Sequence, residues 1–146
     1  MEYTSSSVAQ THELAQHLVK DLNHNLICLY GELGSGKTTF VQGMAKALGI
    51  KKRLLSPTFI LVREYRIKNS QLPITNYQLL FHVDCYRIAS AKDIKSVDLA
   101  ELWSDPNNLV VIEWAQRLQK ILPNRRIDIK FSYEAQNKRK IEIIHR

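Results

Sequence analysis

The stretch that decides the fold is Leu26-Ile-Cys-Leu-Tyr-Gly-Glu-Leu-Gly-Ser-Gly-Lys-Thr-Thr39, an apolar run that leads through a glycine-punctuated loop into an amphipathic segment. Its core, Gly31-x-x-x-x-Gly36-Lys37-Thr38, matches the phosphate-binding loop pattern at every fixed position. Glycines let the backbone approach a ligand closely, so that its N–H groups can surround phosphate oxygens. A bare turn before a helix has no need of the Lys-Thr pair, so the stretch predicts a nucleotide phosphate site.

Each residue type in this loop has a chemical role. Lys37 is expected to reach the β and γ phosphates, and the Thr38 hydroxyl to ligate Mg²⁺. The helix that begins near Lys37 adds unpaired N–H groups and the positive end of its dipole. The residues expected to line the phosphate site are Gly31, Gly34, Ser35, Gly36, Lys37, Thr38 and Thr39.

Composition predicts an ordinary globular domain. The 146 residues suffice for one domain, 1–146, with a core of its own. No apolar run is long enough to span a bilayer, and the first residues lack the basic and apolar regions of a secretion signal, so we expect a cytosolic location without membrane contact. Cys28 and Cys85 are interpreted as reduced, structural thiols.

The chain carries a formal net charge of +7. The basic clusters are Lys51-Lys52-Arg53, Arg125-Arg126 and Lys138-Arg139-Lys140, each in an expected loop or turn. A solvated surface is the simplest interpretation, and no RNA-binding aromatic signature accompanies the clusters. Charge alone therefore does not make this chain an RNA-binding protein.

Hydrophobic patterning predicts an α/β protein of the P-loop NTPase class, with three layers and a mainly parallel central sheet. The unbroken apolar run Leu26–Tyr30 is typical of a parallel strand covered on both faces. Ser7 is a plausible N-cap for the helix that precedes this strand. Further expected elements are an edge strand at 4–7, a helix from near Lys37 closed by Gly49, strands at 60–67, 77–83 and 109–112, helices at 90–103 and 115–122, and an antiparallel C-terminal hairpin at 127–133 and 139–143.

Ser56-Pro57-Thr58-Phe59 lies between the first core helix and the next strand. Pro57 keeps the preceding residue extended, which places Thr58 at the mouth of that strand. A hydroxyl in this position of a P-loop protein can sense the γ phosphate and its metal. A simple strand-entry turn explains the same residues equally well.

Two apolar runs end in acids, at Asp84 and at Glu113. Carboxylates at the carboxyl ends of buried strands lie beside the ligand crevice of an α/β sheet. One would position the metal and the other would orient or deprotonate the attacking water, and spacing does not decide which. His82 is interpreted as a hydrogen-bonded structural histidine, and Trp114 either packs on nucleotide or partner or belongs to the core.

Four short motifs in a fixed order resemble the TsaE (formerly YjeE) family: Gly31-Glu-Leu-Gly-Ser-Gly-Lys-Thr-Thr39, Ser56-Pro-Thr-Phe59, His82-Val-Asp-Cys-Tyr-Arg87 and Val111-Ile-Glu-Trp114. The resemblance implies a small ATPase required for threonylcarbamoyladenosine modification of tRNA. It implies that Lys37, Thr38 and Thr39 bind ATP and Mg²⁺, that Thr58 belongs to a switch-like loop, that Asp84 and Glu113 act on metal and water, and that Trp114 lies beside the nucleotide. It also implies two partners, TsaB and TsaD, through which tRNA is reached.

The first hypothesis is therefore an Mg²⁺-dependent ATPase with weak turnover on its own, because the sequence offers no evident arginine finger. A small nucleoside or nucleotide kinase is the second hypothesis, since strand-Asp-x-Tyr-Arg is also found in that group. A non-hydrolysing nucleotide switch or a basic RNA-binding module is the third. The kinase would need a second pocket and an arginine-bearing lid, for which the chain has no obvious segment.

Overall fold

The computed structural model describes residues 1–54, 62–68, 75–89, 94 and 98–146. The elements along the chain are β1 (Glu2–Ser5), α1 (Val8–Lys20), β2 (Leu26–Tyr30), α2 (Lys37–Ala47), β3 (Val62–Arg66), β4 (Leu79–Asp84), α3 (Leu99–Ser104), β5 (Asn108–Glu113), the 3-10 turn η2 (Ala115–Leu118), β6 (Ile127–Ala135) and β7 (Lys138–His145).

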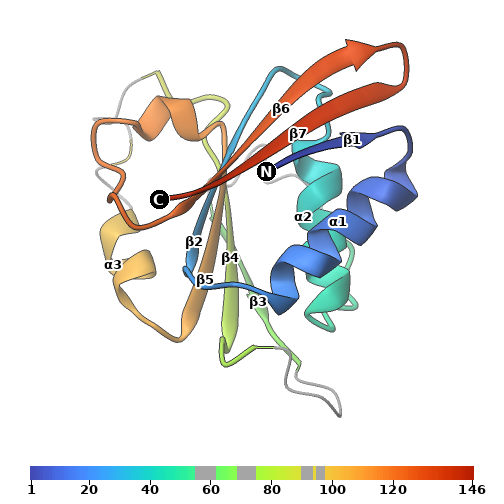
Figure 1. Ribbon diagram of the computed structural model, residues 1–146. Helices are drawn as coiled ribbons and strands as arrows, with labels where there is room; N and C mark the ends of the chain where they lie inside the picture. Colours follow the sequence, from blue (N-terminus) through green and yellow to red (C-terminus); the bar gives the residue numbers. More distant parts are fainter. Residues whose placement is uncertain (55–61, 69–74, 90–93, 95–97) are drawn as a thin grey trace.

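Seven strands form one mixed sheet in the order β1-β7-β6-β2-β5-β4-β3. The four central strands β6, β2, β5 and β4 are parallel, whereas β3 at one edge and β7 and β1 at the other are antiparallel to their neighbours. Figure 1 shows α1 and α2 together on one side of the sheet and α3 on the other. The predicted three-layer α/β class, with antiparallel edges and a C-terminal hairpin, is confirmed.

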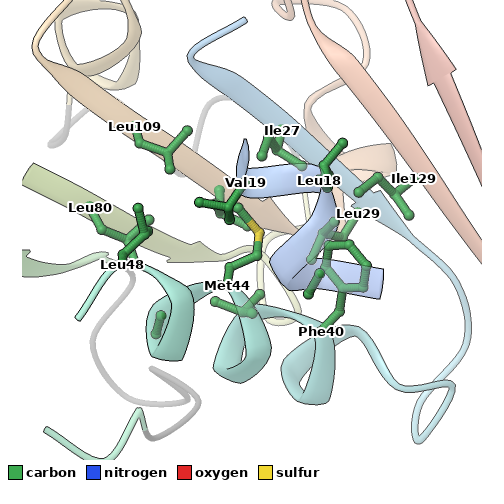
Figure 2. Close-up of a cluster of buried hydrophobic side chains, with 14 of the residues drawn as sticks. Leu18, Val19, Ile27, Leu29, Phe40, Met44, Leu48, Leu80, Leu109 and Ile129 are labelled. Carbon is green, nitrogen blue, oxygen red and sulfur yellow. The ribbon is translucent and has the colours of Figure 1, made fainter. Parts of the chain in front are cut away.

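The layer on the α1 and α2 side is the larger core. Ser7 caps α1 as predicted, since its side chain accepts a hydrogen bond from the Gln10 N–H at 3.1 Å. The two helices pack so closely that a Cβ at Gly43 would lie 2.7 Å from the His12 Cα. Figure 2 shows Met44 of α2 directed at Val19 of α1 and the ring of Phe40 beside Leu29 of β2, so α2 packs against both α1 and β2.

Strand β2 is buried on both faces because its alternate residues enter two different cores. Ile27 and Leu29 face α1 and α2, while Leu26 and Cys28 face the layer of α3 and η2. Burial raises the pKa of the Cys28 thiol to about 12, and the pKa of Cys85 likewise to about 12. Both thiols are therefore protonated at neutral pH. Because β2 is buried on both faces, it is a fixed support for the loop that follows it.

Two element predictions are wrong in their boundaries near the N-terminus and after β4. The edge strand is Glu2–Ser5, because the Ser5 hydroxyl bonds to the Ser7 carbonyl and to Thr11, which turns the chain into α1. A continuous helix at 90–103 is excluded at Asp98, whose non-helical backbone (ψ of 84°) and side-chain bond to the Glu101 N–H begin α3 anew. Residues 90–93 of the predicted helix lie outside the described residues.

The predicted helix at 115–122 is also shorter than expected. Only a single 3-10 turn, Ala115–Leu118, forms there. The Leu118 carbonyl accepts from the N–H groups of both Ile121 and Leu122, and Pro123 follows directly. Beyond Leu122 the turns cannot continue, because Pro123 offers no N–H.

Within the described part of the chain, no helix combines the length and apolarity needed to cross a membrane.

Candidate functional site

The loop between β2 and α2 has the backbone that its glycines predict. Gly31 has φ of 147°, and a Cβ there would meet the Phe131 carbonyl at 2.6 Å and the Ser35 Oγ at 2.8 Å. Gly36 is the N-cap of α2 with φ of 105°, a conformation that L side chains rarely adopt. Since no side chain caps α2, its first N–H groups face the loop.

Lys37 is the first residue of α2, and its side chain turns back toward the loop. Its Nζ donates to the Gly31 carbonyl at 2.7 Å and to the Glu32 carbonyl at 2.9 Å, and lies 4.1 Å from the centre of the Trp114 ring. Burial lowers the pKa of Lys37, while the charges of Glu113, Asp84 and Glu32 oppose that shift. An ammonium has three N–H groups, so a further donor remains for an anion in the cleft.

Thr38 and Glu113 are in direct contact. The Thr38 Oγ1 lies 2.9 Å from both carboxylate oxygens of Glu113 and donates to them. His82, which is fully buried, lies with its Nε2 2.8 Å from Glu113 Oε1. Its Nδ1 has no hydrogen-bond partner among the described residues, and Nε2 is the ring nitrogen whose proton is donated to Glu113, since a carboxylate oxygen accepts. The prediction that His82 is hydrogen-bonded is confirmed, and its partner is Glu113.

Asp84 lies beside Glu113 at the same edge of the sheet. The two residues are paired in register between the parallel strands β4 and β5, and Asp84 is 8 % exposed. Asp84 Oδ1 accepts from the Tyr86 N–H at 2.9 Å, which turns the chain away from the strand end. The predicted convergence of two strand-end carboxylates on the loop is therefore observed.

Trp114 directly follows Glu113 and adopts φ of 58°, which is uncommon for a residue with a Cβ. The indole is 9 % exposed, and its ring centre lies 5.0 Å from that of Tyr86. Trp114 packs in the core of α3 and η2, as one of its two interpretations predicted, and it also lines the cleft. Its contact with nucleotide or a partner stays a prediction. Left-handed backbone of this kind costs about 1–3 kcal/mol and is commonly found at functional sites.

A cleft of about 240 Å³ brings the site residues together. It is lined by Leu33, Gly34, Ser35, Gly36, Lys37, Thr38, Thr39, Asp84, Tyr86, Glu113 and Trp114. The Ser35 hydroxyl is fully buried and has no hydrogen-bond partner within the described ranges. Thr58, the expected switch residue, lies outside the described residues.

A second cleft of about 250 Å³ adjoins the first and shares Gly34, Gly36 and Thr39 with it. Its other wall comes from Ser6 and Ser7 before α1 and from Asn137 and Arg139 in the turn between β6 and β7. The Tyr133 hydroxyl donates to the Leu33 carbonyl at 3.2 Å and so ties this hairpin to the loop. The sequence did not predict this wall, because Ser6 and Ser7 lie near one end of the sequence and Asn137 and Arg139 near the other.

The oxygen ligands at the cleft suit Mg²⁺. Thr38, Glu113 and Asp84 offer a hydroxyl and two carboxylates, which are the hard donors that this ion prefers. The described parts of the chain contain no group of three or more His, Cys, Asp or Glu side chains that could hold a metal by themselves. Mg²⁺ commonly binds through one or two carboxylates plus substrate phosphates, so this donor set fits a shared site.

A mixed α/β sheet, a glycine loop between β2 and α2 and two strand-end acids define a protein of the P-loop NTPase fold class. The model of one family, described as threonylcarbamoyl adenosine biosynthesis protein TsaE, matches residues 5–141. The chain belongs to the TsaE family, which takes part in tRNA threonylcarbamoyladenosine biosynthesis.

Curated relatives agree with this assignment. The chain is 34% identical over 147 residues to the tRNA threonylcarbamoyladenosine biosynthesis protein TsaE of Aquifex aeolicus, which covers 97% of this chain and 94% of that protein. The proteins of the same name from Haemophilus influenzae and Bacillus subtilis are 31% and 32% identical, with 82% and 80% of this chain and 69% and 67% of those proteins covered. A crystal structure of Bacillus subtilis YdiB has the same fold, with a TM-score of 0.77 at 24% identity over 99% of this chain and 84% of that one.

Proposed function

We propose that this protein is an Mg²⁺-dependent ATPase that acts in threonylcarbamoyladenosine modification of tRNA together with TsaB and TsaD homologues. The observation that carries the proposal is the direct contact of Thr38 with Glu113, at 2.9 Å, at the mouth of the glycine loop. The hydroxyl of a phosphate loop beside a strand-end carboxylate is the pair that holds a nucleotide-bound metal in this class of proteins.

The loop and Lys37 bind the phosphates. The open N–H groups at the start of α2 and the Lys37 ammonium supply positive charge where the β and γ phosphates would lie. The second cleft, which shares Gly34, Gly36 and Thr39, would take the nucleoside end of the nucleotide. Bound Mg²⁺ would neutralise developing charge on the phosphates, held by Thr38 with Glu113 and Asp84.

Glu113 is the residue proposed to handle the attacking water. His82 donates to Oε1 and Thr38 donates to both oxygens, so the carboxylate keeps its orientation at the edge of the cleft. A carboxylate held in this way accepts a proton or a hydrogen bond from water in a fixed direction. Asp84 supports the metal from the neighbouring strand.

Turnover is expected to be weak in the isolated chain. No arginine is found among the described residues that line the cleft of Lys37 and Glu113. An arginine finger supplied by a partner is worth about 10³–10⁵ in rate in P-loop proteins. A complex with the TsaB and TsaD homologues is therefore expected to change the rate of hydrolysis.

The experiment compares wild-type and Glu113→Gln proteins, with and without the two partners, for ATP affinity and for phosphate release. We expect the variant to keep ATP affinity within about threefold and to lose about 100-fold or more in turnover. Glutamine preserves the shape and removes the charge. Full turnover in Glu113→Gln would refute the role of this acid, and transfer of phosphate to a nucleoside would favour the kinase hypothesis.

A further inference from the structure

The end of the sheet opposite the nucleotide cleft carries the positive charge of this protein. It includes these described segments at the amino-terminal edge of the parallel strands: residues 20–25, 46–54, 66–68, 75–78, 105–108 and 123–126. We name these segments the basic end. They contain nine Lys and Arg against two Asp, a formal excess of seven, which equals the net charge of the whole chain.

Most of this charge is not neutralised within the molecule. Eight of the nine cations, all except Arg126, are exposed and form no ion pair among the described residues. They are Lys20, Lys46, Lys51, Lys52, Arg53, Arg66, Lys68 and Arg125. Two lysines elsewhere are paired, since Lys130 lies 3.8 Å from Glu142 and Lys140 lies 2.8 Å from Glu2. The basic end therefore projects an attractive field toward polyanions.

A groove crosses the basic end between two of these cations. It consists of two clefts of about 490 and 590 Å³ that share Tyr77 and Pro106. Arg125 lines the first cleft and Lys20 the second, and Trp103 is a wall of the first. The Asn25 amide donates to the Trp103 carbonyl at 2.9 Å, which fixes that wall to the start of β2.

The chemistry of the groove identifies its occupant. Tyr77 and Trp103 are half-buried, so each is anchored in the core while part of its surface stays accessible. Aromatic side chains between unpaired cations bind single-stranded nucleic acid, because the bases stack on the rings while the cations hold the phosphates. Asn23, Asn76 and Asn107 add amide groups that can bond to base edges or to ribose hydroxyls.

We propose that the basic end binds RNA, with a single-stranded loop of tRNA lying in the groove from Arg125 to Lys20. The choice of tRNA rests on the proposed function, but the groove lies at the opposite edge of the sheet from the nucleotide cleft. RNA would thus bind without blocking ATP, and the nucleotide end would stay open to protein partners. An acidic protein is the competing occupant of the same field.

The test measures binding of a fluorescently labelled, unmodified tRNA transcript to the full chain without ATP, at several salt concentrations. We expect Lys20→Ala/Arg125→Ala to weaken binding about tenfold at low salt and to reduce the slope of log affinity against log salt by about 1.5. Tyr77→Leu, which keeps an apolar side chain but removes the ring, should weaken binding at least about fivefold. Circular dichroism establishes that each variant is folded.

The matched control is Lys130→Ala/Lys140→Ala, which removes the same charge from cations that are already paired. It should bind tRNA within about twofold of wild type, and so should Glu113→Gln, which separates this proposal from the ATPase proposal. Equal losses in the control, or no tRNA binding by wild type at micromolar concentration, would overturn the proposal. So would a result in which Lys20 and Arg125 are needed for binding the TsaB and TsaD homologues but not for binding tRNA.

Discussion

Glu113 of β5 and Asp128 of β6 lie on the two strands that flank β2, and each is 2 % exposed, yet their surroundings differ. Asp128 accepts hydrogen bonds from the guanidinium groups of Arg126 and Arg146 and from the Tyr30 hydroxyl at 3.0 Å. Glu113 accepts from a hydroxyl and an imidazole, and among the described residues no Arg or Lys forms an ion pair with it.

This contrast distinguishes a buried carboxylate with a structural role from one that is available to a metal ion or a proton. A buried carboxylate that two arginines neutralise within the chain needs nothing more, and it holds the C-terminal residue to the start of β6. A buried carboxylate that no arginine or lysine pairs with keeps its negative charge available for a metal ion or a proton. Asp84, next to Glu113 in register, increases that negative charge.

The largest expected effect on stability is at Asp128. Asp128→Ala should lower the free energy of unfolding by about 3 kcal/mol, because it leaves the Arg126 guanidinium buried without its partner. Glu113→Gln should change it by less than about 1 kcal/mol, since a neutral amide costs less to bury than a charge. Urea unfolding measures the free energy of unfolding of both variants. Similar decreases in Asp128→Ala and Glu113→Gln would contradict the contrast between the two acids.

The same contrast has a pH dependence. Burial alone would raise the pKa of Asp128, but hydrogen bonds from Arg126, Arg146 and Tyr30 outweigh burial and lower it from its ordinary value of 3.8. A group with a lowered pKa stabilises the folded state above its unfolded pKa and loses that contribution as the pH falls through the folded value. Wild-type stability should therefore decline below about pH 4, by a contribution that Asp128→Asn lacks.

The second effect concerns ligand binding at the cleft. Lys37→Ala should weaken ATP binding by about 100-fold, because it removes the only lysine that lines this cleft within the described part of the chain. Thermal stability should be retained, since burial already disfavours the charged form of Lys37. Calorimetric titration measures the affinity, and unchanged binding would contradict the role of the loop.

A smaller effect is expected at His82, which contacts Glu113 but not the cleft. His82→Ala should reduce kcat by about tenfold with ATP affinity unchanged, because Glu113 loses the donor that orients it. His82→Gln, which can donate from a similar position, should recover part of the loss. Equal changes in kcat and in ATP affinity would indicate general damage to the fold.

Much of the site was predictable because its parts are local in sequence. The phosphate loop, its Lys37 and Thr38 and the convergence of Asp84 and Glu113 follow from motif spacing and from the rule that parallel strands end at one edge. The bond of His82 to Glu113 depends on the register of β4 against β5, which no local pattern encodes. The Asp128 cluster contains a hydrogen bond between residues 98 positions apart, so it too required the structure.

The fold was predictable to the level of elements and less so at their ends. Unbroken or alternating apolar runs predicted the strands, and apolar stripes predicted the helices α1 and α2. The helix predicted at 90–103 failed because Asp98 is a better N-cap than an interior residue. The helix predicted at 115–122 stopped early because Trp114 enters it with left-handed backbone and Pro123 follows.

The most direct test uses the two tryptophans, which lie at opposite ends of the sheet: Trp114 in the nucleotide cleft and Trp103 in the groove of the basic end. In Trp103→Phe protein, titration with Mg²⁺-ATP should change the fluorescence of Trp114, because Lys37 lies 4.1 Å from its ring and would move to the phosphates. In Trp114→Phe protein the same titration should leave the fluorescence of Trp103 unchanged. A response of Trp103 without one of Trp114 would contradict the placement of the nucleotide in this cleft.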